Sequence, residues 1–424
     1  MERKGLLIGI DFSDEFCKIC YFNERHNSVE TVVPPAGSMR YLIPSVVCFS
    51  QEKQDWIIGE EAREYSLKTG AFLFDSLLSR TLSGEKYSLN NEELYYDSLL
   101  AVFIEKALDM TRKFAGVFPI RRVNICLRRV NMQIKEVMEQ VFSKVGIEKE
   151  KLRLLNYAEC FAYFISWQDP ALWEDGAGIF DLSKDGFYFS QLTFSKENLR
   201  NIFYINERNC SMDLSVKDLE NEVLRPRADE KLNRIYEEVK TGAERTSIYF
   251  TGSGFEELWF SNTLKNISRT RRAFRGNNIY AKGACLEGYL REEGVLCRIT
   301  VVCRPRTRAY ISIEAKKGKK TEDVVLSPAA VDWYEASGSA DFILDETRTL
   351  NFKVTSLLSR EETEIAFDLS SFPERPPKTT RVRARAEYIN EFECELSAVD
   401  LGFGNFFPGS GAEVKKILDL EEYI

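Results

Sequence analysis

Two segments about 170 residues apart each contain an apolar strand with an aspartate at its end. The run 6–12 contains Asp11, the run 178–183 contains Asp181, and a turn and a return strand follow each of them. A carboxylate beside the backbone N–H groups of such a turn can hold a metal-bound phosphate. Because the unit is repeated, we expect a duplicated lobe in which Asp11 and Asp181 face each other across a cleft.

Residues near these aspartates define a candidate nucleotide and Mg²⁺ site. A turn with Gly252 and Gly254 follows a short apolar strand, and glycine lets a backbone approach a ligand closely. Phe255, directly after this turn, offers an apolar face for a base. The candidates are Asp11, Ser13, Asp181, Ser183, Gly186, Gly252, Ser253, Gly254 and Phe255. A structural alternative stays open, in which the aspartates cap strand ends and the glycines serve only the strand-to-helix turn.

Histidine and cysteine chemistry has little support. His26 is the single histidine and lies in a polar turn, which argues against a Ser–His catalytic arrangement. Cys17 and Cys20 have CxxC spacing but lie in an expected strand, where residues i and i+3 point to opposite faces. No second pair completes a zinc motif, so we expect no structural metal. The ten cysteines are scattered through apolar runs, as is typical of free thiols in a reducing cytosol.

The composition is that of a globular protein with several domains. The chain has 424 residues, 44% of them hydrophobic, and a net charge of −8. No apolar run reaches membrane-spanning length and the first residues do not form a signal peptide, so we expect a cytoplasmic protein without a membrane partner. Two basic clusters, at 269–275 and 316–320, have no clear aromatic platform beside them, and we expect solvated surfaces rather than nucleic-acid binding.

Strand and helix patterns divide the chain into three expected domains. An α/β lobe covers 1–170, and a second, shorter α/β lobe covers 171–293. From residue 294 to 424, short alternating strands between Gly, Pro and Asp/Ser turns predict a β-sandwich. Specific elements expected on this basis are helices at 92–115, 229–241 and 255–264, and a first sandwich strand at 297–303.

Five segments, in order, resemble motifs of the actin-like ATPase superfamily, and of its DnaK-type heat-shock chaperones in particular. They are 41–47, 58–62, 154–156, 251–255, which resembles an adenosine-binding Gly-Gly-Ser-Thr-Arg, and 282–284. The resemblance implies an α/β two-lobed actin-like ATPase fold with duplicated ribonuclease-H-like lobes, followed by a C-terminal β-sandwich. It also implies a bacterial DnaK-like subfamily with degenerate nucleotide motifs.

The sequence departs from that family at the positions that the resemblance assigns to the nucleotide site. Leu77 stands where the resemblance places the catalytic lysine, and Ser13-Asp14-Glu15 replaces Gly-Thr-Thr in the first turn. The other changes are Tyr188 for the second aspartate of the second lobe, Arg128 near a family proline, and Tyr157-Ala158 for Glu-Pro. Each carboxylate at the first turn disfavours a phosphate by on the order of 1–4 kcal/mol. Two expectations for a cofactor stay open. Either ATP or ADP binds weakly together with Mg²⁺, or the protein has no cofactor. No residue is assigned as catalytic.

Three function classes stay open. The favoured class is a non-catalytic or weakly nucleotide-gated scaffold that binds a protein or peptide partner. The first alternative is an active ATP-dependent, chaperone-like ATPase, and the second is an actin-like structural protein that assembles with itself. Phosphoryl transfer depends on positioned donors around the phosphates, so the degraded motifs argue against an enzyme.

Aromatic loops in the C-terminal domain are the candidates for partner contact. The chaperones that the chain resembles bind peptides with sandwich loops, and loops diverge while a core persists. The candidates are Trp333, Tyr334, Phe403, Phe406 and Phe407. The alternative is that these aromatic residues bury themselves against the lobes and lock the domains together.

Overall fold

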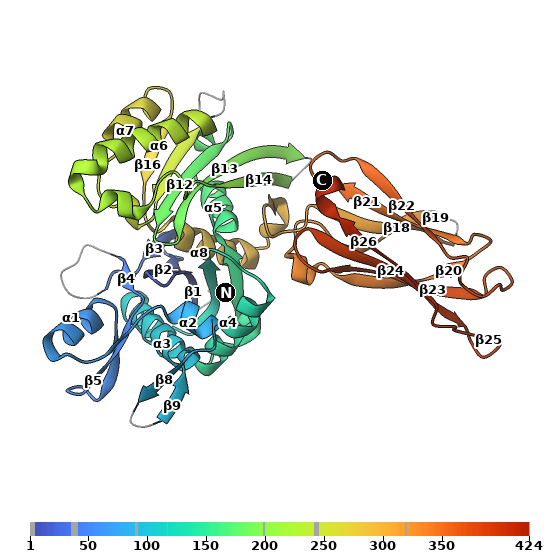
Figure 1. Cartoon of the computed structure of the whole chain (residues 1–424), viewed down its shortest axis with the longest axis horizontal. Helices are drawn as coiled ribbons and strands as arrows, with labels where there is room; N and C mark the ends of the chain where they lie inside the picture. The colour runs from blue at the N-terminus through green and yellow to red at the C-terminus, as the bar shows by residue number, and fades with distance from the viewer. Residues whose placement is uncertain are drawn as a thin grey trace. The chain divides into compact units, whose positions relative to one another are not determined.

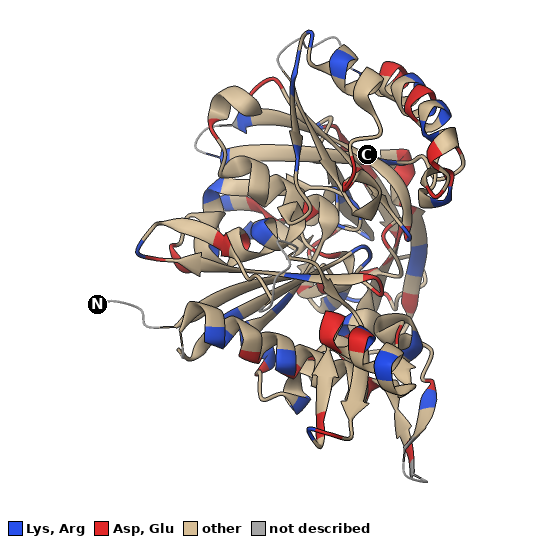
Figure 2. Cartoon of the chain, turned by 90° about the vertical axis from the view of Figure 1, so that its left-hand side faces the viewer, with Lys and Arg blue, Asp and Glu red and all other residues tan. Residues whose placement is uncertain are grey.

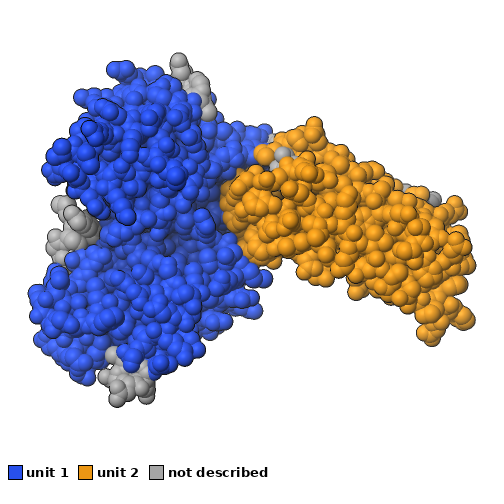
Figure 3. Space-filling view, in the orientation of Figure 1, with its two compact units in different colours: residues 1–301 blue, residues 302–424 orange. Residues whose placement is uncertain are grey.

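The computed structural model describes residues 5–34, 41–89, 92–116, 118–197, 200–240, 246–318 and 320–423. The chain divides into two compact units, Met1–Val301 and Val302–Ile424, which Figure 3 colours separately. All the described α-helices lie in unit 1, together with several sheets, whereas the described part of unit 2 consists of strands and short 3₁₀ turns. The structure is therefore mixed α/β with a β-rich C-terminal region.

The first sheet of unit 1 joins a parallel half to an antiparallel half (Figure 1). Its strand order is β11-β10-β1-β2-β3, and β4 also pairs with β2. β11, β10 and β1 are parallel, whereas β2 is antiparallel to both β1 and β3. All seven residues of β1 are buried, as expected for a central strand covered on both faces. The strands are β1 Leu6–Phe12, β2 Phe16–Asn23, β3 Ser28–Thr31, β4 Ile43–Pro44, β10 Ile120–Leu127 and β11 Leu152–Asn156.

The second sheet of unit 1 repeats this arrangement. Its order is β16-β15-β12-β13-β14-β17, in which β16, β15 and β12 are parallel and β12, β13 and β14 are antiparallel. Thus β12 corresponds in position to β1, and the β12–β13 hairpin corresponds to the β1–β2 hairpin. The strands are β12 Ala177–Ser183, β13 Gly186–Glu197, β14 Arg200–Asn209, β15 Ser247–Thr251, β16 Arg272–Arg275 and β17 Ile299–Val302.

Between β4 and β10 the chain adds a small sheet of order β6-β5-β7 and the two-stranded hairpin β8-β9. These strands are β5 Val47–Ser50, β6 Asp55–Ile58, β7 Leu73–Phe74, β8 Lys86–Leu89 and β9 Glu92–Tyr95. The helices of unit 1 are α1 Gly59–Thr69, α2 Leu77–Leu82, α3 Tyr96–Ala115, α4 Met132–Lys144, α5 Tyr157–Ser166, α6 Arg225–Val239, α7 Ser261–Ile267 and α8 Ile279–Glu292. Figure 2 shows basic and acidic residues interspersed along surface helices, the pattern of solvated faces. Within the described ranges, no helix combines the length and apolar character needed to cross a membrane.

Helix α8 packs closely against both α5 and β1. A side-chain carbon added to Gly283 of α8 would lie 1.8 Å from the carbonyl oxygen of Cys160 in α5. One added to Gly9 of β1 would lie 2.2 Å from the carbonyl oxygen of Ala281. Only glycine permits these approaches, which bring the N-terminal turns of α5 and α8 together at the end of β1.

Unit 2 contains two antiparallel sheets that share one hydrophobic core. One sheet has the order β19-β18-β21-β22, and in the other β20-β23-β24 is extended by β25 and β26, which both pair with β24. Ile311 and Phe352 from the first sheet and Val382 and Leu396 from the second are buried in the same cluster. The strands are β18 Ala309–Lys317, β19 Lys320–Ser327, β20 Gly338–Leu344, β21 Thr349–Ser356, β22 Glu362–Asp368, β23 Thr380–Tyr388, β24 Glu393–Phe403, β25 Phe407–Pro408 and β26 Glu413–Asp419.

Three expected elements differ from the structure. The helix expected at 92–115 begins only at Tyr96, because Glu92–Tyr95 pairs with β8 instead. The helix expected at 255–264 is replaced by a 3₁₀ turn, Ser253–Phe255, and by α7, because Phe255, Trp259 and Phe260 all pack into one core. The strand expected at 297–303 is β17, which extends the second sheet beside β14, so the compact units divide at 301/302 rather than at 294.

Candidate functional site

Asp11 is neutralised by its neighbour across the first hairpin. The register of β1 and β2 places Asp11 opposite Lys18, and the Lys18 Nζ lies 2.7 Å from Asp11 Oδ2. Both side chains are largely buried, with exposed fractions of 1% for Asp11 and 12% for Lys18. Burial alone would lower the pKa of Lys18, but the charge of Asp11 and its hydrogen bond raise that pKa above the ordinary value. The pair is therefore a buried ion pair at the end of β1.

Asp181 is neutralised by a cation from the other half of unit 1. Arg128, directly after β10, forms an ion pair with the Asp181 carboxylate, and its guanidinium lies 4.2 Å from the ring centre of Tyr188. Burial opposes the charge of Arg128, yet Asp181 and further acidic groups raise its pKa above the ordinary arginine value. A second carboxylate, that of Glu207, lies 3.5 Å from the guanidinium. Arg128 thus joins the first sheet to the second.

A stacked pair of tyrosines connects the two aspartates. The Tyr157 hydroxyl donates to Asp11 at 2.8 Å, and the Tyr280 hydroxyl donates to Asp181 at 3.1 Å. The two rings stack with centres 4.1 Å apart and an interplanar angle of 16°. Burial, followed by the nearby aspartates, raises the pKa of both hydroxyls, so they remain protonated donors. Asp11 and Asp181 therefore lie on opposite sides of one tyrosine pair.

The polar side chains of the first turn also accept hydrogen bonds from backbone N–H groups of the protein. The Ser13 hydroxyl accepts from the backbone N–H groups of Glu15 and Phe16, which closes the turn. Asp14 accepts from the N–H groups of Leu78 and Ser79 and so caps the start of α2. This cap lies at the position where the resemblance places a catalytic lysine, now Leu77.

The glycine turn after β15 packs on the second hairpin. Gly252 has φ +93°, and a side-chain carbon there would lie 2.3 Å from the Leu182 carbonyl oxygen. A carbon added to Gly254 would lie 2.4 Å from the Leu182 side chain. Ser183, the last residue of β12, pairs with Gly186, the first residue of β13, and Gly186 has φ +132°. Gly252 and Gly254 are therefore positions at which close packing on Leu182 leaves no room for a side chain.

Phe255 is not available as an apolar face for a base. It is 0% exposed and packs against Phe250, Trp259 and Phe260 in the hydrophobic core beside the second sheet. The expectation for Phe255 is wrong because the backbone after Gly254 turns the ring inward, away from the neighbouring cavity.

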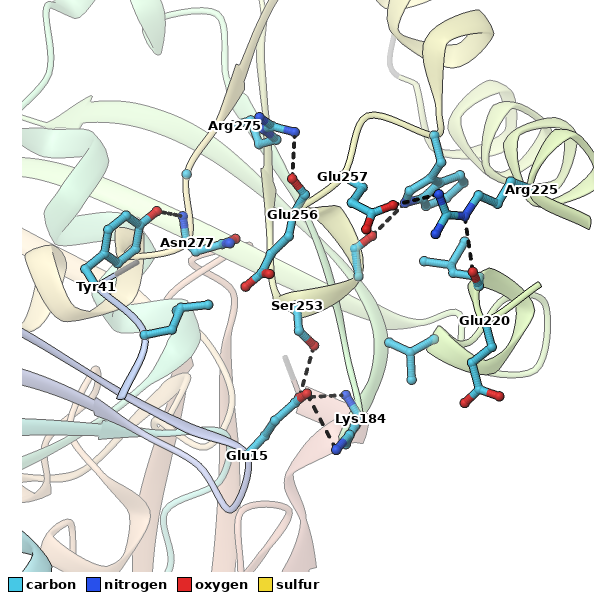
Figure 4. Close-up of a pocket in the computed structure, with 16 residues that line it drawn as sticks. Glu15, Tyr41, Lys184, Glu220, Arg225, Ser253, Glu256, Glu257, Arg275 and Asn277 are labelled. Carbon is cyan, nitrogen blue, oxygen red and sulfur yellow. Dashed lines mark hydrogen bonds and ion pairs between the residues drawn. The ribbon is translucent and has the colours of Figure 1, made fainter. Parts of the chain in front are cut away.

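A cavity of about 630 Å³ lies beside this turn (Figure 4). The Glu15 carboxylate accepts from the Ser253 hydroxyl at 3.0 Å and lies 3.8 Å from the Lys184 ammonium. Four carboxylates and three cations line the space: Glu15, Glu220, Glu256 and Glu257, with Lys184, Arg225 and Arg275. The side-chain oxygen of Asn277 is buried there and has no hydrogen-bond partner among the residues that the structure describes. The cavity is polar and of mixed charge.

These residues do not fit a Mg²⁺-bound triphosphate. Both aspartates that would hold the cation already have a protein cation and a tyrosine hydroxyl as partners. Asp14 and Glu15 occupy the turn that would contact the phosphates, and Ser253 donates to Glu15. Removing one partner from a buried pair leaves an uncompensated charge, at a cost of about 3–5 kcal/mol. What the arrangement does chemically is hold the two halves of unit 1 together.

Lys18 and Tyr280 belong to the site but carry no motif signal. Lys18 could have been found from the hairpin, because a strand pair that joins Phe12 to Cys17 must place Lys18 opposite Asp11. Tyr280 meets Asp181 only after the chain has folded, 99 residues apart in sequence. Long-range contacts of this kind have no local pattern.

The aromatic candidates of unit 2 lie at two ends of one sheet. Trp333 precedes β20 at the end where Gly338 pairs with Ala386, and it packs against the core of unit 2. Its neighbour Tyr334 contacts it edge to face. At the opposite end, Phe403 pairs with Phe407 across the hairpin between β24 and β25. Phe403 is 45% exposed and Phe406 is 93% exposed. The two loops therefore do not form one contact surface on this sheet.

The chain belongs to the family of unknown function DUF5716, whose C-terminal model matches residues 28–303. A second model, a domain of unknown function named DUF8552, matches residues 306–420. The two matches follow the division into units 1 and 2. A search of curated proteins gave no match.

Proposed function

We propose that this protein is a non-catalytic, protein-binding scaffold whose body is an actin-like, DnaK-type pair of lobes with a self-filled nucleotide site. The repeated sheet order, β11-β10-β1-β2-β3 and β16-β15-β12-β13-β14, supports duplicated ribonuclease-H-like lobes. The two sheets of unit 2, which share a core, support a β-sandwich as the partner-binding part. The burial of nine of the ten thiols supports a cytoplasmic location.

The observation that carries this proposal is the bonding of the two aspartates. Asp11 holds Lys18 and Tyr157, and Asp181 holds Arg128 and Tyr280. Arg128, Tyr157 and Tyr188 are three of the positions at which the sequence departs from the chaperone-like pattern, and all three meet in this cluster. Each of these three side chains thus contacts an aspartate of the cluster or another of the three.

Phosphate release from Mg·ATP tests the proposal. We expect the wild type and Asp181→Asn to release phosphate at the same background rate, because neither presents an open metal site. Turnover by the wild type that Asp181→Asn abolishes would overturn the proposal and favour the chaperone-like ATPase. The same preparations in calorimetry should give no binding heat with ATP and Mg²⁺, which excludes a weakly gated form as well.

A further inference from the structure

A second cavity of unit 1, here called the aromatic cavity, lies among α1, β7, β8 and the start of α3. Its volume is about 770 Å³, and Phe72, Phe74, Tyr87 and Tyr96 are among its walls. The Phe74 ring is 4.7 Å from that of Phe72 and 5.1 Å from that of Tyr87, centre to centre. Phe74, Tyr87 and Tyr96 are buried, whereas Phe72 is 68% exposed. A concave aromatic site of this size accepts an apolar side chain.

Charged residues at the aromatic cavity are already paired. Arg80 lies 2.8 Å from Glu85 and 3.3 Å from Asp75, and one of its nitrogens also donates to the Tyr96 hydroxyl. The Lys86 ammonium lies 3.3 Å from Glu93. An occupant that brought its own charge would have to compete with these pairs. The cavity therefore favours a neutral, apolar occupant.

Unit 2 carries a neutral, apolar protrusion. The hairpin 401–410 contains no charged residue, and Phe406 at its tip is 93% exposed. The base of the hairpin is fixed by Asp400, which accepts from Arg375 at 2.6 and 2.8 Å and from the N–H groups of Gly402 and Ser410. The Arg375 guanidinium holds the pKa of Asp400 well below its usual range, so this anchor keeps its charge. The hairpin is thus a neutral aromatic knob on a fixed base.

We infer that Phe406 of one copy inserts into the aromatic cavity of a second copy of this chain. The knob is neutral and aromatic, and the cavity is aromatic with its charges internally satisfied, so the two surfaces are complementary. Because knob and cavity are different surfaces, each contact takes the knob of one copy and the cavity of the other. This inference does not depend on the state of the aspartate cluster.

The buried area indicates weak association. An aromatic side chain buries about 150–250 Å², whereas a stable interface buries about 1,200–2,000 Å² in total. Phe406, with contributions from Phe403 and the cavity walls, stays below that range. Association should therefore be weak and depend on protein concentration.

Sedimentation velocity of the full chain over a wide concentration range tests this contact. We expect the wild-type sedimentation coefficient to rise continuously with concentration, and Phe406→Ser and Phe72→Ser each to remain monomeric. An equimolar mixture of the two variants should form dimers and nothing larger, because one variant keeps only its cavity and the other only its knob. Leu358→Ser, another exposed apolar residue of unit 2 at 48%, should behave as the wild type.

A wild type that stays monomeric throughout would overturn the inference, as would variants that associate like the wild type. Phe72 is exposed, so its substitution should leave the fold intact, and a melting curve checks this. Should Phe72→Ser unfold, Ser88→Trp fills the cavity from its exposed wall and must abolish association in the same way. Retained association in Ser88→Trp would place the knob elsewhere and refute the cavity as its site.

Discussion

At the scale of single residues, the central feature is the neutralisation of two buried carboxylates by cations of the same chain. Such pairs add little net stability when intact, because desolvation offsets the attraction, but they are costly to break on one side. Lys18 comes from the same hairpin as Asp11, whereas Arg128 comes from the other half of unit 1. Loss of Arg128 should therefore weaken both the local site and the connection between halves.

Arg128→Met should lower the free energy of unfolding of unit 1 by about 3–5 kcal/mol, because Asp181 is left buried without its cation. The double variant Arg128→Met/Asp181→Asn should lose less than the single variant. Arg208→Met breaks an exposed pair with Glu238, 48% exposed on both sides, and should cost about 0–1 kcal/mol. Urea unfolding followed by tryptophan fluorescence measures this, since four of the five tryptophans lie in unit 1. Equal losses in the single and double variants would refute the pairing argument.

The sequence pattern draws attention to the two acids but not to the side chains that contact them. Asp11 and Asp181 stand out because each ends an apolar run, and their hairpins repeat. Arg128 and Tyr157 are recognisable only as replacements, and nothing local shows that they turn toward the aspartates. Phe255 was misassigned because a sequence motif gives the order of residues but not the direction of a side chain after a glycine turn.

At the scale of elements, the crossing of α5 and α8 sets the position of the tyrosine pair. Tyr157 is the first residue of α5, which a capping box of Asn156 and Glu159 begins, and Tyr280 lies in the first turn of α8. The two helices approach closely at Gly283. The strand and helix periods predict most of these elements. They do not predict β9, because this strand has only four residues and a longer helical pattern follows it directly.

Gly283→Ala should destabilise unit 1 by about 1–3 kcal/mol through overpacking against Cys160. That loss should exceed the gain in helix propensity of about 1 kcal/mol. Gly288→Ala in the same helix is the matched control, since its nearest heavy atom would be 3.3 Å away rather than 1.8 Å. Thermal unfolding of both variants checks the order. If Gly283→Ala were as stable as Gly288→Ala, the close helix crossing would be wrong.

At the scale of the whole molecule, the two units have different roles in the proposed scaffold. Unit 1 has two sheets of the same strand order, and its aspartate cluster is closed by its own side chains. Unit 2 carries the exposed aromatic hairpin, and unit 1 also carries the aromatic cavity. A body that needs no nucleotide to hold its halves together would present these contact surfaces constantly.

The unfolding midpoint of unit 1 with increasing Mg·ATP tests this account most directly. A ligand that binds only the native state stabilises it by RT ln(1 + [L]/Kd), about 2.7 kcal/mol at a concentration of 100 Kd. We predict that the tryptophan-detected midpoint of the wild type does not change with Mg·ATP, because Lys18 and Arg128 already occupy the carboxylates. A midpoint that rises with Mg·ATP in the wild type, but not in Asp181→Asn, would contradict the self-filled site.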